Sequence, residues 1–551
     1  MTSDCSLMAK ARTRKTDQRL AGIRDALAQG RPEDALTAAR RLLAGRVRDA
    51  AVLNLAGIAA FQCGEKGDAR DLLEEAVKRA PKDAEIRMNL GNVHAASGET
   101  AAALEAYAAG SELAPAYAEP AYNAGLLLAG RGRHRNAAAW FETAMARDPS
   151  HGGAAIGHAE ALRSAGDLAG ARTALEAWVA LNPDDPVAYT NLAAVLSGTG
   201  DDAAACDAAA KAAALDPGLA AAHFNLGVAQ QGLGQHEAAA EQYRRTLALE
   251  QGHAAAALNL GEAYAALGER AEAEKAYRRA LGIDPGFAKA AINLADMSLV
   301  AGDPASALDE IGRFMQRTPS HPAALAFKAF ALRDLGREKD ALNLDDPDRF
   351  IRRRPLAAPD GFDDMMAFNA KLAEHVLSHP TLTPSPKAHA TRKGRHSGEL
   401  LTAPLGPMAA FRSEIEEAFR AYKRSFAGEP AHPFIDACPG EIAISVWGVV
   451  MEQDGHQVPH IHPAAWLSGV YYAEVPESVR DDDPERAGWI EFGRPPEDIH
   501  AAHDPAVTYF KPEPGLMLLF PSHFYHRTVP LAGTARRISI AFDVFPAAGW
   551  D

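Results

Sequence analysis

Proline recurs at a fixed interval between residues 81 and 319. Every gap is 34 residues except one of 68, where Gln251 stands at the missing position; the prolines are Pro81, Pro115, Pro149, Pro183, Pro217, Pro285 and Pro319. A 34-residue period in which a proline closes each unit is typical of helix–turn–helix solenoids. Each repeat of a solenoid packs only on its neighbours, so the length of 551 residues does not by itself set the number of domains.

The interior of one repeat shows which residues would pack. In the unit from Asp83 to Pro115, Leu90 is followed by the small Gly91, which permits a second helix to approach closely, and a polar turn follows at Ser97–Glu99. The second helix carries small and aromatic residues at the i, i+4, i+7 spacing of a buried stripe. These are Ala103, Tyr107 and Gly110, with Ala137, Phe141 and Ala144, and Ala273, Tyr277 and Ala280, at the equivalent positions of two other units. The pattern resembles the tetratricopeptide repeat family, which implies an α solenoid of about nine repeats over residues 16–344.

Asparagine occupies one position of the first helix in most repeats. The residues are Asn89, Asn123, Asn191, Asn225, Asn259 and Asn293, and Gly157 interrupts the series. First helices line the concave groove in the tetratricopeptide family, so the resemblance implies a row of carboxamides there, similar to the asparagine ladder in the repeats of O-GlcNAc transferase. A carboxamide offers two donors and an acceptor, enough to pair with the main chain of an extended peptide. Alternatively, asparagine caps neighbouring backbone groups, and the sequence leaves both interpretations open. The first makes these substrate-groove residues for a polypeptide.

The repeat pattern ends at about residue 344, and the region 345–551 reads as a second domain. Two helical stretches are followed by alternating apolar and β-branched runs: "EIAISVWGVVME", "WLSGVYYAEV", "GWIEFG", "GLMLLFP" and "RRISIAFDVF". Prolines, glycines and aspartates separate these runs, which indicates five or more strands. The spacing favours an antiparallel sandwich or barrel. We therefore expect an all-β domain fused to the solenoid.

Three histidines in the β region could hold a metal ion. His460 and His462 are two residues apart in "PHIHP", so both point to the same face if the segment is a strand end. His526 follows the apolar run "GLMLLF". Imidazole is a suitable ligand for iron, zinc and copper. These three residues are the expected metal ligands, and no further catalytic residue is expected.

The order "HIHPAAWLSGVYY", "GLMLLFPSHFYHRTVP", "RRISIAFDVF" resembles the 2-oxoglutarate and Fe(II)-dependent oxygenases. The resemblance implies a double-stranded β-helix, or jelly roll, with Fe(II) at its open mouth and 2-oxoglutarate and O₂ as cosubstrates. Family members usually bind iron through His-x-Asp/Glu and a distant histidine. In this chain His462 stands at the carboxylate position, so the resemblance implies a three-histidine set.

The resemblance also implies a cosubstrate clamp. Arg537 and Ser539 match the family's Arg-x-Ser motif, and strand alternation places them on one face, with Arg536 on the other. A guanidinium and a hydroxyl could meet one carboxylate of 2-oxoglutarate. Tyr472 matches a family tyrosine that binds the same carboxylate, and Ser468 shares its strand parity. These four residues are the expected cofactor-binding set.

Composition limits the partners. A formal net charge of −15 argues against nucleic acid, and no apolar run approaches the length needed to span a bilayer. The N-terminal stretch does not read as a signal peptide, and the four cysteines lack CxxC spacing, so we expect a cytoplasmic protein. His456 and His523 lie near the metal ligands in the sequence and could donate hydrogen bonds to them or be plain surface residues; we expect them at the surface.

Two classes of function follow. The first is an oxygenase that uses 2-oxoglutarate and Fe(II) to hydroxylate a peptide or protein side chain bound by the repeats. The second is a non-catalytic repeat scaffold whose β domain is a relic or a sensor. A three-histidine dioxygenase that does not use 2-oxoglutarate is a further alternative.

Overall fold

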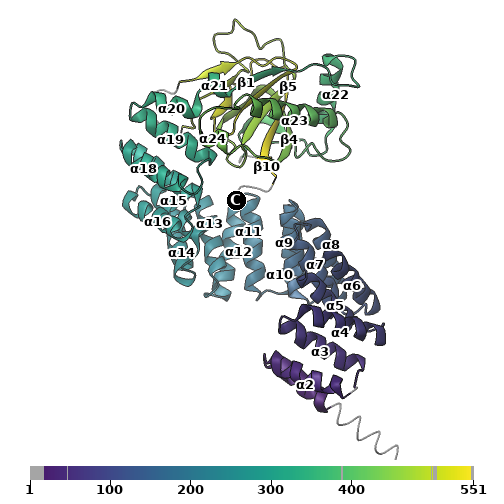
Figure 1. Cartoon of the computed structure of the whole chain (residues 1–551). Helices are drawn as coiled ribbons and strands as arrows, with labels where there is room; N and C mark the ends of the chain where they lie inside the picture. The colour runs from purple at the N-terminus through teal and green to yellow at the C-terminus, as the bar shows by residue number, and fades with distance from the viewer. Residues whose placement is uncertain (1–17, 46, 386–388, 498, 500–505, 548–551) are drawn as a thin grey trace, which may run out of the picture. The chain divides into compact units, whose positions relative to one another are not determined.

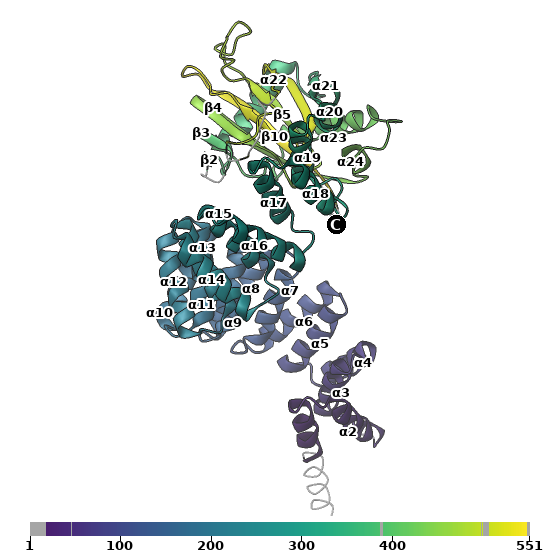
Figure 2. The ribbon, with the colours of Figure 1, turned by 90° about the vertical axis from the view of Figure 1, so that its left-hand side faces the viewer.

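The computed structural model describes residues 18–45, 47–385, 389–497, 499 and 506–547. The chain divides into two compact units, residues 1–251 and 252–551; their elements are labelled in Figures 1 and 2. This division falls inside the repeats. The predicted boundary at residues 344 and 345 stays a prediction, and the predicted repeat start at residues 16 and 17 lies outside the described residues.

The first unit is built from helices in its described residues. Residues 18–28 are helical. The helices that follow are α2 (Pro32–Ala44), α3 (Ala50–Gln62), α4 (Lys66–Arg79), α5 (Ala84–Ala96), α6 (Thr100–Leu113), α7 (Glu119–Ala129), α8 (His134–Arg147), α9 (Gly152–Ser164), α10 (Leu168–Leu181), α11 (Pro186–Gly198), α12 (Asp202–Leu215), α13 (Ala220–Gly232) and α14 (His236–Leu249).

Within a pair, an aromatic side chain packs directly on a glycine of the partner helix. A Cβ added at Gly91 would lie 2.6 Å from a ring carbon of Tyr107, which no real side chain could accept. The same holds where Phe141 covers Gly125. The predicted close approach at Gly91 is therefore confirmed.

A second glycine series closes the turn inside each pair. These glycines have φ between 69° and 85°, the left-handed region that glycine adopts without steric cost. They recur every 34 residues as Gly30, Gly64, Gly98, Gly132, Gly166, Gly200, Gly234, Gly268, Gly302 and Gly336. The series marks ten helix pairs in the described residues, against about nine expected.

The second unit contains both repeat helices and the β region. Its repeat helices are α15 (Ala254–Ala266), α16 (Arg270–Ile283), α17 (Ala288–Val300), α18 (Pro304–Met315), α19 (Pro322–Asp334) and α20 (Glu338–Asp345). The remaining helices are α21 (Pro347–Phe350), α22 (Met365–Ser378), α23 (Met408–Arg424) and α24 (Pro433–Asp436).

Among the described residues, ten strands form one antiparallel sheet that curls into a half-barrel. They are β1 (Arg352–Pro355), β2 (Thr383–Pro384), β3 (Thr391–His396), β4 (Ile442–His460), β5 (Leu467–Glu474), β6 (Ile490–Phe492), β7 (Thr508–Phe510), β8 (Leu516–Pro521), β9 (His526–Thr528) and β10 (Arg537–Pro546). The main strand order is β1-β8-β5-β10-β4-β9-β6-β7, and β3 pairs with β2 and β4. The predicted fold class, a repeat solenoid and a jelly-roll domain with flanking helices, is confirmed.

Aromatic packing joins the flanking helices to the sheet. Tyr471 of β5 contacts Phe411 of α23, with ring centroids 5.1 Å apart, and Phe368 of α22, at 6.5 Å. One continuous buried cluster runs from Ala291 of α17 through the β strands to Val544. The last repeat helices and the β region therefore share a core. Among the described residues, no helix combines the length and apolar character needed to cross a membrane.

Candidate metal centre and its cavity

The end of β4 and the start of β9 bring two of the predicted ligands together. His460 and His526 are direct partners across the antiparallel pair. Their ring centroids are 4.2 Å apart. The first half of β4 pairs with β10, and Asp454, with φ of 58°, lies where the strand leaves that pairing. The far end of β4 is thus free to pair with β9 and to place His460 beside His526.

His462 completes the group two residues beyond the end of β4. Its backbone N–H donates to the Ser522 carbonyl at 3.0 Å, and its ring stacks on Trp447 at 5.7 Å. Its centroid lies 5.2 Å from each of the other two imidazoles. One ligand atom from each histidine lies within 4.8 Å of the others, as a common metal ion requires.

Hydrogen bonds fix which nitrogen each imidazole presents. Nδ1–H of His460 donates to the Val458 carbonyl at 2.8 Å, and Nδ1–H of His526 donates to the Phe524 carbonyl at 3.0 Å. Nδ1–H of His462 donates to Oδ2 of Asp543 at 2.8 Å. Because each Nδ1 is used in this way, Nε2 is the nitrogen left for a metal.

Burial keeps two of the imidazoles in the ligating form. Burial, and after it the neighbouring His462, lower the pKa of His460 to about 4. Burial also lowers the pKa of His526 well below its ordinary value. Both rings are therefore neutral near pH 7, and only the neutral imidazole can bind a metal.

Asp543 is a functional residue that the sequence interpretation missed. It lies on β10 opposite Ser468, whose hydroxyl donates to Asp543 Oδ1 at 2.6 Å while Oδ2 accepts from His462. A hydroxyl–hydroxyl hydrogen bond of 2.8 Å continues the network to Ser522. The ligand group itself contains no carboxylate, and the Asp543 carboxylate instead binds the ring of His462 and orients it. Asp543 shares the strand parity of Arg537 and Ser539, which predicts its face of β10 but not its contact with His462.

Arg537 is buried in the same cavity, with 2% of its surface exposed. Nη1 donates to the Gly488 carbonyl at 2.7 Å, and Nη2 contacts Thr528 Oγ1 at 3.2 Å and Met451 Sδ at 3.1 Å. Nε is buried without a hydrogen-bond partner. No carboxylate of the described residues pairs with this guanidinium, and burial lowers its pKa. A buried cation without a counterion is a built site for an anionic ligand.

Tyr472 and Ser539 lie beside Arg537. They are cross-strand partners on β5 and β10, and the Tyr472 ring centroid is 5.7 Å from Cζ of Arg537. Burial raises the pKa of Tyr472 to about 12, so its hydroxyl stays protonated and can donate to an anion. Arg536 points away and pairs with Glu474 at 2.9 Å, as the strand alternation predicts.

The structure places all seven predicted metal and cofactor residues on the lining of one cavity. They are His460, His462, His526, Arg537, Ser539, Tyr472 and Ser468, joined by Gln457 and Thr528, which the sequence interpretation did not include. The hydroxyl of Ser468 is used toward Asp543. The roles of these residues stay predictions.

The two neighbouring histidines differ from each other. His456 is half-buried, and its Nδ1 donates to the Asp454 carbonyl at 2.8 Å. The expected surface position of His523 is wrong. It is buried, its Nε2–H donates to the Leu344 carbonyl of α20 at 2.9 Å, and burial lowers its pKa to about 4. A histidine in a strand-to-strand turn reads as exposed, but here the last repeat helix covers the turn.

The asparagine series is half-buried and hydrogen-bonded within the chain. Nδ2 of Asn89 donates to Asn54 Oδ1 at 3.0 Å, and Nδ2 of Asn123 donates to Asn92 Oδ1 at 3.2 Å. Nδ2 of Asn225 donates to the Thr190 carbonyl, also across a repeat boundary, at 2.9 Å. The remaining members have partners as well: Asn191 donates to Val187 of its own helix, Asn293 bonds Tyr277, and Asn259 is also engaged. One amide hydrogen of a bonded carboxamide is thus in use, and the substrate-groove role stays a prediction.

The fold and the cavity define a helical-repeat protein with a jelly-roll domain that carries a three-histidine centre. Residues 445–543 match the family described as "Putative 2OG-Fe(II) oxygenase", and this match begins and ends on β4 and β10. Two tetratricopeptide repeat families match residues 128–196 and residues 20–84, 57–118, 88–152 and 224–286. The chain is therefore similar to tetratricopeptide repeat proteins over these repeat residues, and to the family described as a putative 2OG-Fe(II) oxygenase over residues 445–543.

Three solved structures illustrate the similarity of this chain to known folds. MamA from Desulfovibrio magneticus is 26% identical, with 31% of this chain and 96% of that chain covered and a TM-score of 0.28. A tetratricopeptide repeat protein from Parabacteroides merdae is 18% identical, with 45% and 98% covered and a TM-score of 0.34. YrrB, described as a TPR protein with an unusual peptide-binding site, is 21% identical, with 40% and 95% covered and a TM-score of 0.27. No curated protein matches the chain.

Proposed function

We propose that the protein is a 2-oxoglutarate- and Fe(II)-dependent oxygenase that hydroxylates a side chain of a peptide or protein bound by its repeats. The observation that carries the proposal is Arg537, a buried guanidinium without a carboxylate partner among the described residues, in the same cavity as three imidazoles. The overall reaction would convert 2-oxoglutarate, O₂ and the substrate C–H into succinate, CO₂ and the hydroxylated product.

The residues that line the cavity suit Fe(II) and 2-oxoglutarate. His460, His462 and His526 would hold Fe(II) through Nε2, and Asp543 would keep the His462 ring oriented. Arg537, Tyr472 and Ser539 would bind a carboxylate of 2-oxoglutarate through N–H and O–H donors. Bound iron supplies the activation of dioxygen that the hydroxylation needs. Phe520 and Phe492, whose rings lie 4.7 Å and 5.9 Å from the His526 ring, help exclude water from the centre.

The repeats support a polypeptide substrate. Stacked helical repeats form extended surfaces that suit long ligands, and the net charge of −15 disfavours nucleic acid. A cytoplasmic location is part of the proposal. A three-histidine dioxygenase that does not use 2-oxoglutarate is the second candidate, favoured by the absence of a carboxylate from the histidine group itself. A non-catalytic scaffold or sensor is the third.

Arg537 also provides the test. Purified protein with Fe(II), ascorbate and 2-oxoglutarate should produce succinate, and calorimetry with Mn(II) in place of iron should show 2-oxoglutarate binding. Arg537→Gln should weaken this binding at least about 100-fold, because truncating a buried charge pair costs several kcal/mol. Arg536→Gln is the matched control and should change the affinity less than about twofold, because Arg536 is exposed and forms a surface ion pair with Glu474. Metal binding without 2-oxoglutarate binding would favour the second candidate. The absence of both metal binding and 2-oxoglutarate binding would favour the third candidate.

A further inference from the structure

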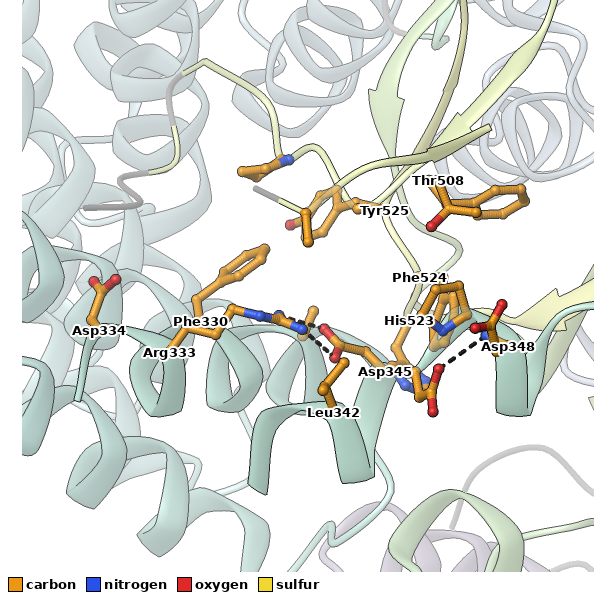
Figure 3. A pocket seen from close by; sticks show the side chains of 17 residues that line it. Phe330, Arg333, Asp334, Leu342, Asp345, Asp348, Thr508, His523, Phe524 and Tyr525 are labelled. Atoms are coloured by element: carbon orange, nitrogen blue, oxygen red, sulfur yellow. Dashed lines mark hydrogen bonds and ion pairs between the residues drawn. The ribbon is translucent and has the colours of Figure 1, made fainter. Parts of the chain in front are cut away.

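A second cavity lies in the C-terminal unit between the last repeat helices and the rim of the β domain (Figure 3). One wall comes from α19, α20 and α21, and the other from the end of β6 and the turn between β8 and β9. The metal-centre residues do not line it, although His523, Phe524 and Tyr525 of its lining belong to the stretch "GLMLLFPSHFYHRTVP". Its walls combine aromatic rings with carboxylates.

The aromatic wall reaches from the repeat side to the metal side. Phe330 of α19 stacks on Tyr525 with centroids 5.6 Å apart and planes at 25°. Phe492 lines the same cavity, and its ring lies 5.9 Å from the ring of His526. Tyr525 directly precedes His526 in the chain. The cavity and the histidine centre are therefore separated by about one ring.

The charge of the lining is strongly negative. Four aspartates line the cavity against one arginine: Asp334, Asp345, Asp346 and Asp348, and Arg333. Both terminal nitrogens of Arg333 bind Asp345, at 2.7 Å and 2.6 Å, so this arginine is already neutralised. His523, also in the lining, is uncharged near pH 7 because burial lowers its pKa to about 4. Apart from the Arg333–Asp345 pair, three more carboxylates line the cavity, those of Asp334, Asp346 and Asp348, beside the rings of Phe330, Phe492, Phe524 and Tyr525.

The cavity lies beside the repeat position of α19 that corresponds to the asparagine series. Phe327 stands 34 residues after Asn293 and so occupies this position, and it is not part of the lining. The preceding residue, Ala326, lines the cavity together with Phe330 and Arg333 at i+4 and i+7 on the same helix face. A chain lying along the first helices α15, α17 and α19 would therefore pass beside this cavity.

We propose that this cavity binds a lysine or arginine side chain of the polypeptide substrate and so places the neighbouring substrate residues beside the histidine centre. This inference rests on the proposed function, which makes the bound polypeptide a substrate. Carboxylates attract the cationic end, and aromatic faces such as those of Phe330 and Tyr525 bind an ammonium or a guanidinium. An acidic or purely apolar side chain gains neither contact. The cavity would act as a specificity subsite for a basic residue near the residue that is hydroxylated.

Peptide binding to the full chain without iron or 2-oxoglutarate tests the subsite separately from catalysis. The probes are short fluorescein-labelled glycine–alanine–serine peptides with one central arginine, lysine, citrulline, norleucine or glutamate. Fluorescence anisotropy should give a dissociation constant at least about tenfold lower for arginine than for citrulline, which has the same shape without the charge. The preference should decrease as salt is raised, because the rim is open to solvent. Acetyl-arginine amide should compete poorly, since it lacks the flanking chain.

Charge-matched variants locate the effect. Asp346→Asn with Asp348→Asn should remove most of the arginine preference, about tenfold; the first change lies at the N-cap of α21, where asparagine still caps the helix. Asp360→Asn with Asp363→Asn removes the same charge from exposed positions of the same unit and should preserve the preference. Leu342→Arg, at a partly exposed lining position, should occupy the cavity with a resident cation and abolish it.

Three results would overturn the subsite: equal affinity for arginine and citrulline peptides, an arginine preference that survives both cavity variants, or equal affinity for acetyl-arginine amide. Thermal unfolding of each variant separates loss of the subsite from loss of the fold. If arginine peptides bind but no succinate forms in the oxygenase assay, the proposed function fails while the cation subsite stands. If succinate forms but peptide affinity does not depend on the charge of the central residue, the cation subsite fails while the proposed function stands.

Discussion

Polar side chains in the repeats and in the histidine cavity differ in whether they have hydrogen-bond partners within the chain. In the repeats, Asn89 donates to Asn54 and Asn225 donates to Thr190, so half-buried carboxamides have partners within the chain. In the cavity, Nε of Arg537 is fully buried without a partner, and three Nε2 atoms face one another while their Nδ1 atoms are bonded. The first arrangement holds neighbouring helices in register. The second places donors and acceptors where the chain itself cannot satisfy them.

This difference shows where ligands are expected. A buried polar group without a partner costs about 1–3 kcal/mol, and more if it is charged, so folded chains seldom keep one for stability alone. Arg537 has this cost and no carboxylate partner in the described part of the chain. The predictions below alter paired and unpaired groups in turn, and they are ordered by the expected change in free energy.

The largest effect should come from removing a metal ligand. His526→Ala leaves two imidazoles, and we expect Fe(II) or Mn(II) affinity to fall by more than about 100-fold, with loss of turnover. Equilibrium dialysis followed by metal analysis measures this directly. His456→Ala is the control, because His456 only donates to a neighbouring carbonyl and lies outside the histidine group. Unchanged metal affinity in His526→Ala would contradict the assignment of the centre.

A paired but buried histidine should make stability depend on pH. The pKa of His523 in the folded protein is about 4, against about 6.5 in an unfolded chain. Between these values the unfolded chain binds a proton that folded His523 does not, so stability is lost as pH falls from about 6.5 toward 4. The loss attributable to His523 is on the order of 3 kcal/mol.

His523→Gln keeps a donor for the Leu344 carbonyl but cannot titrate in this range. Urea unfolding followed by tryptophan fluorescence should show a smaller loss at acid pH in this variant than in the wild type. His460 and His526 shift in the same direction, so part of the dependence should persist. The control variant His456→Gln should show the same pH dependence of urea unfolding as the wild type. Identical curves for His523→Gln and the wild type would remove His523 as a cause.

Removing the charge behind His462 should have an intermediate effect. Asp543→Asn can still accept from Nδ1–H but no longer provides the negative charge that raises the basicity of the ring. We expect metal affinity to fall by about 10–100-fold, and the absorption spectrum of the Co(II)-loaded protein to shift. Ser468→Ala removes only one hydrogen bond to Asp543 and should cost less. An effect on unfolding temperature alone, with unchanged metal affinity, would make Asp543 a purely structural residue.

Sequence periodicity was enough to predict the elements of the fold. Pro81 to Pro319 gave the repeat, and alternation gave the strands and the opposite faces of Arg536 and Arg537. The contact between Asp543 and His462 could not be read from spacing, because 81 residues separate them and only the register of β10 against β5 brings Asp543 to the site.

The burial of residues between the last repeat helices and the β region could not be predicted from the sequence either. His523 lies in a turn, and its burial depends on α20, 179 residues earlier in the chain at its contact with Leu344. The cavity with Phe330 and Tyr525 has the same origin, since its two walls come from different architectures. Local patterns report which face of an element is apolar but not which other element covers it.

The smallest predicted effect separates the two interpretations of the asparagine series. Asn225→Ala removes a hydrogen bond across a repeat boundary and should lower the free energy of unfolding by about 1 kcal/mol. Asn191→Ala removes only a bond to Val187 within its own helix, and alanine favours the helix, so stability should stay the same or rise slightly. If asparagine serves register alone, peptide affinity should be unchanged in both variants. If the carboxamides bind a peptide main chain, both variants should weaken peptide binding by similar factors despite their unequal effects on stability. Anisotropy with the arginine peptide, beside urea unfolding of the same samples, therefore decides between a structural row and a binding row.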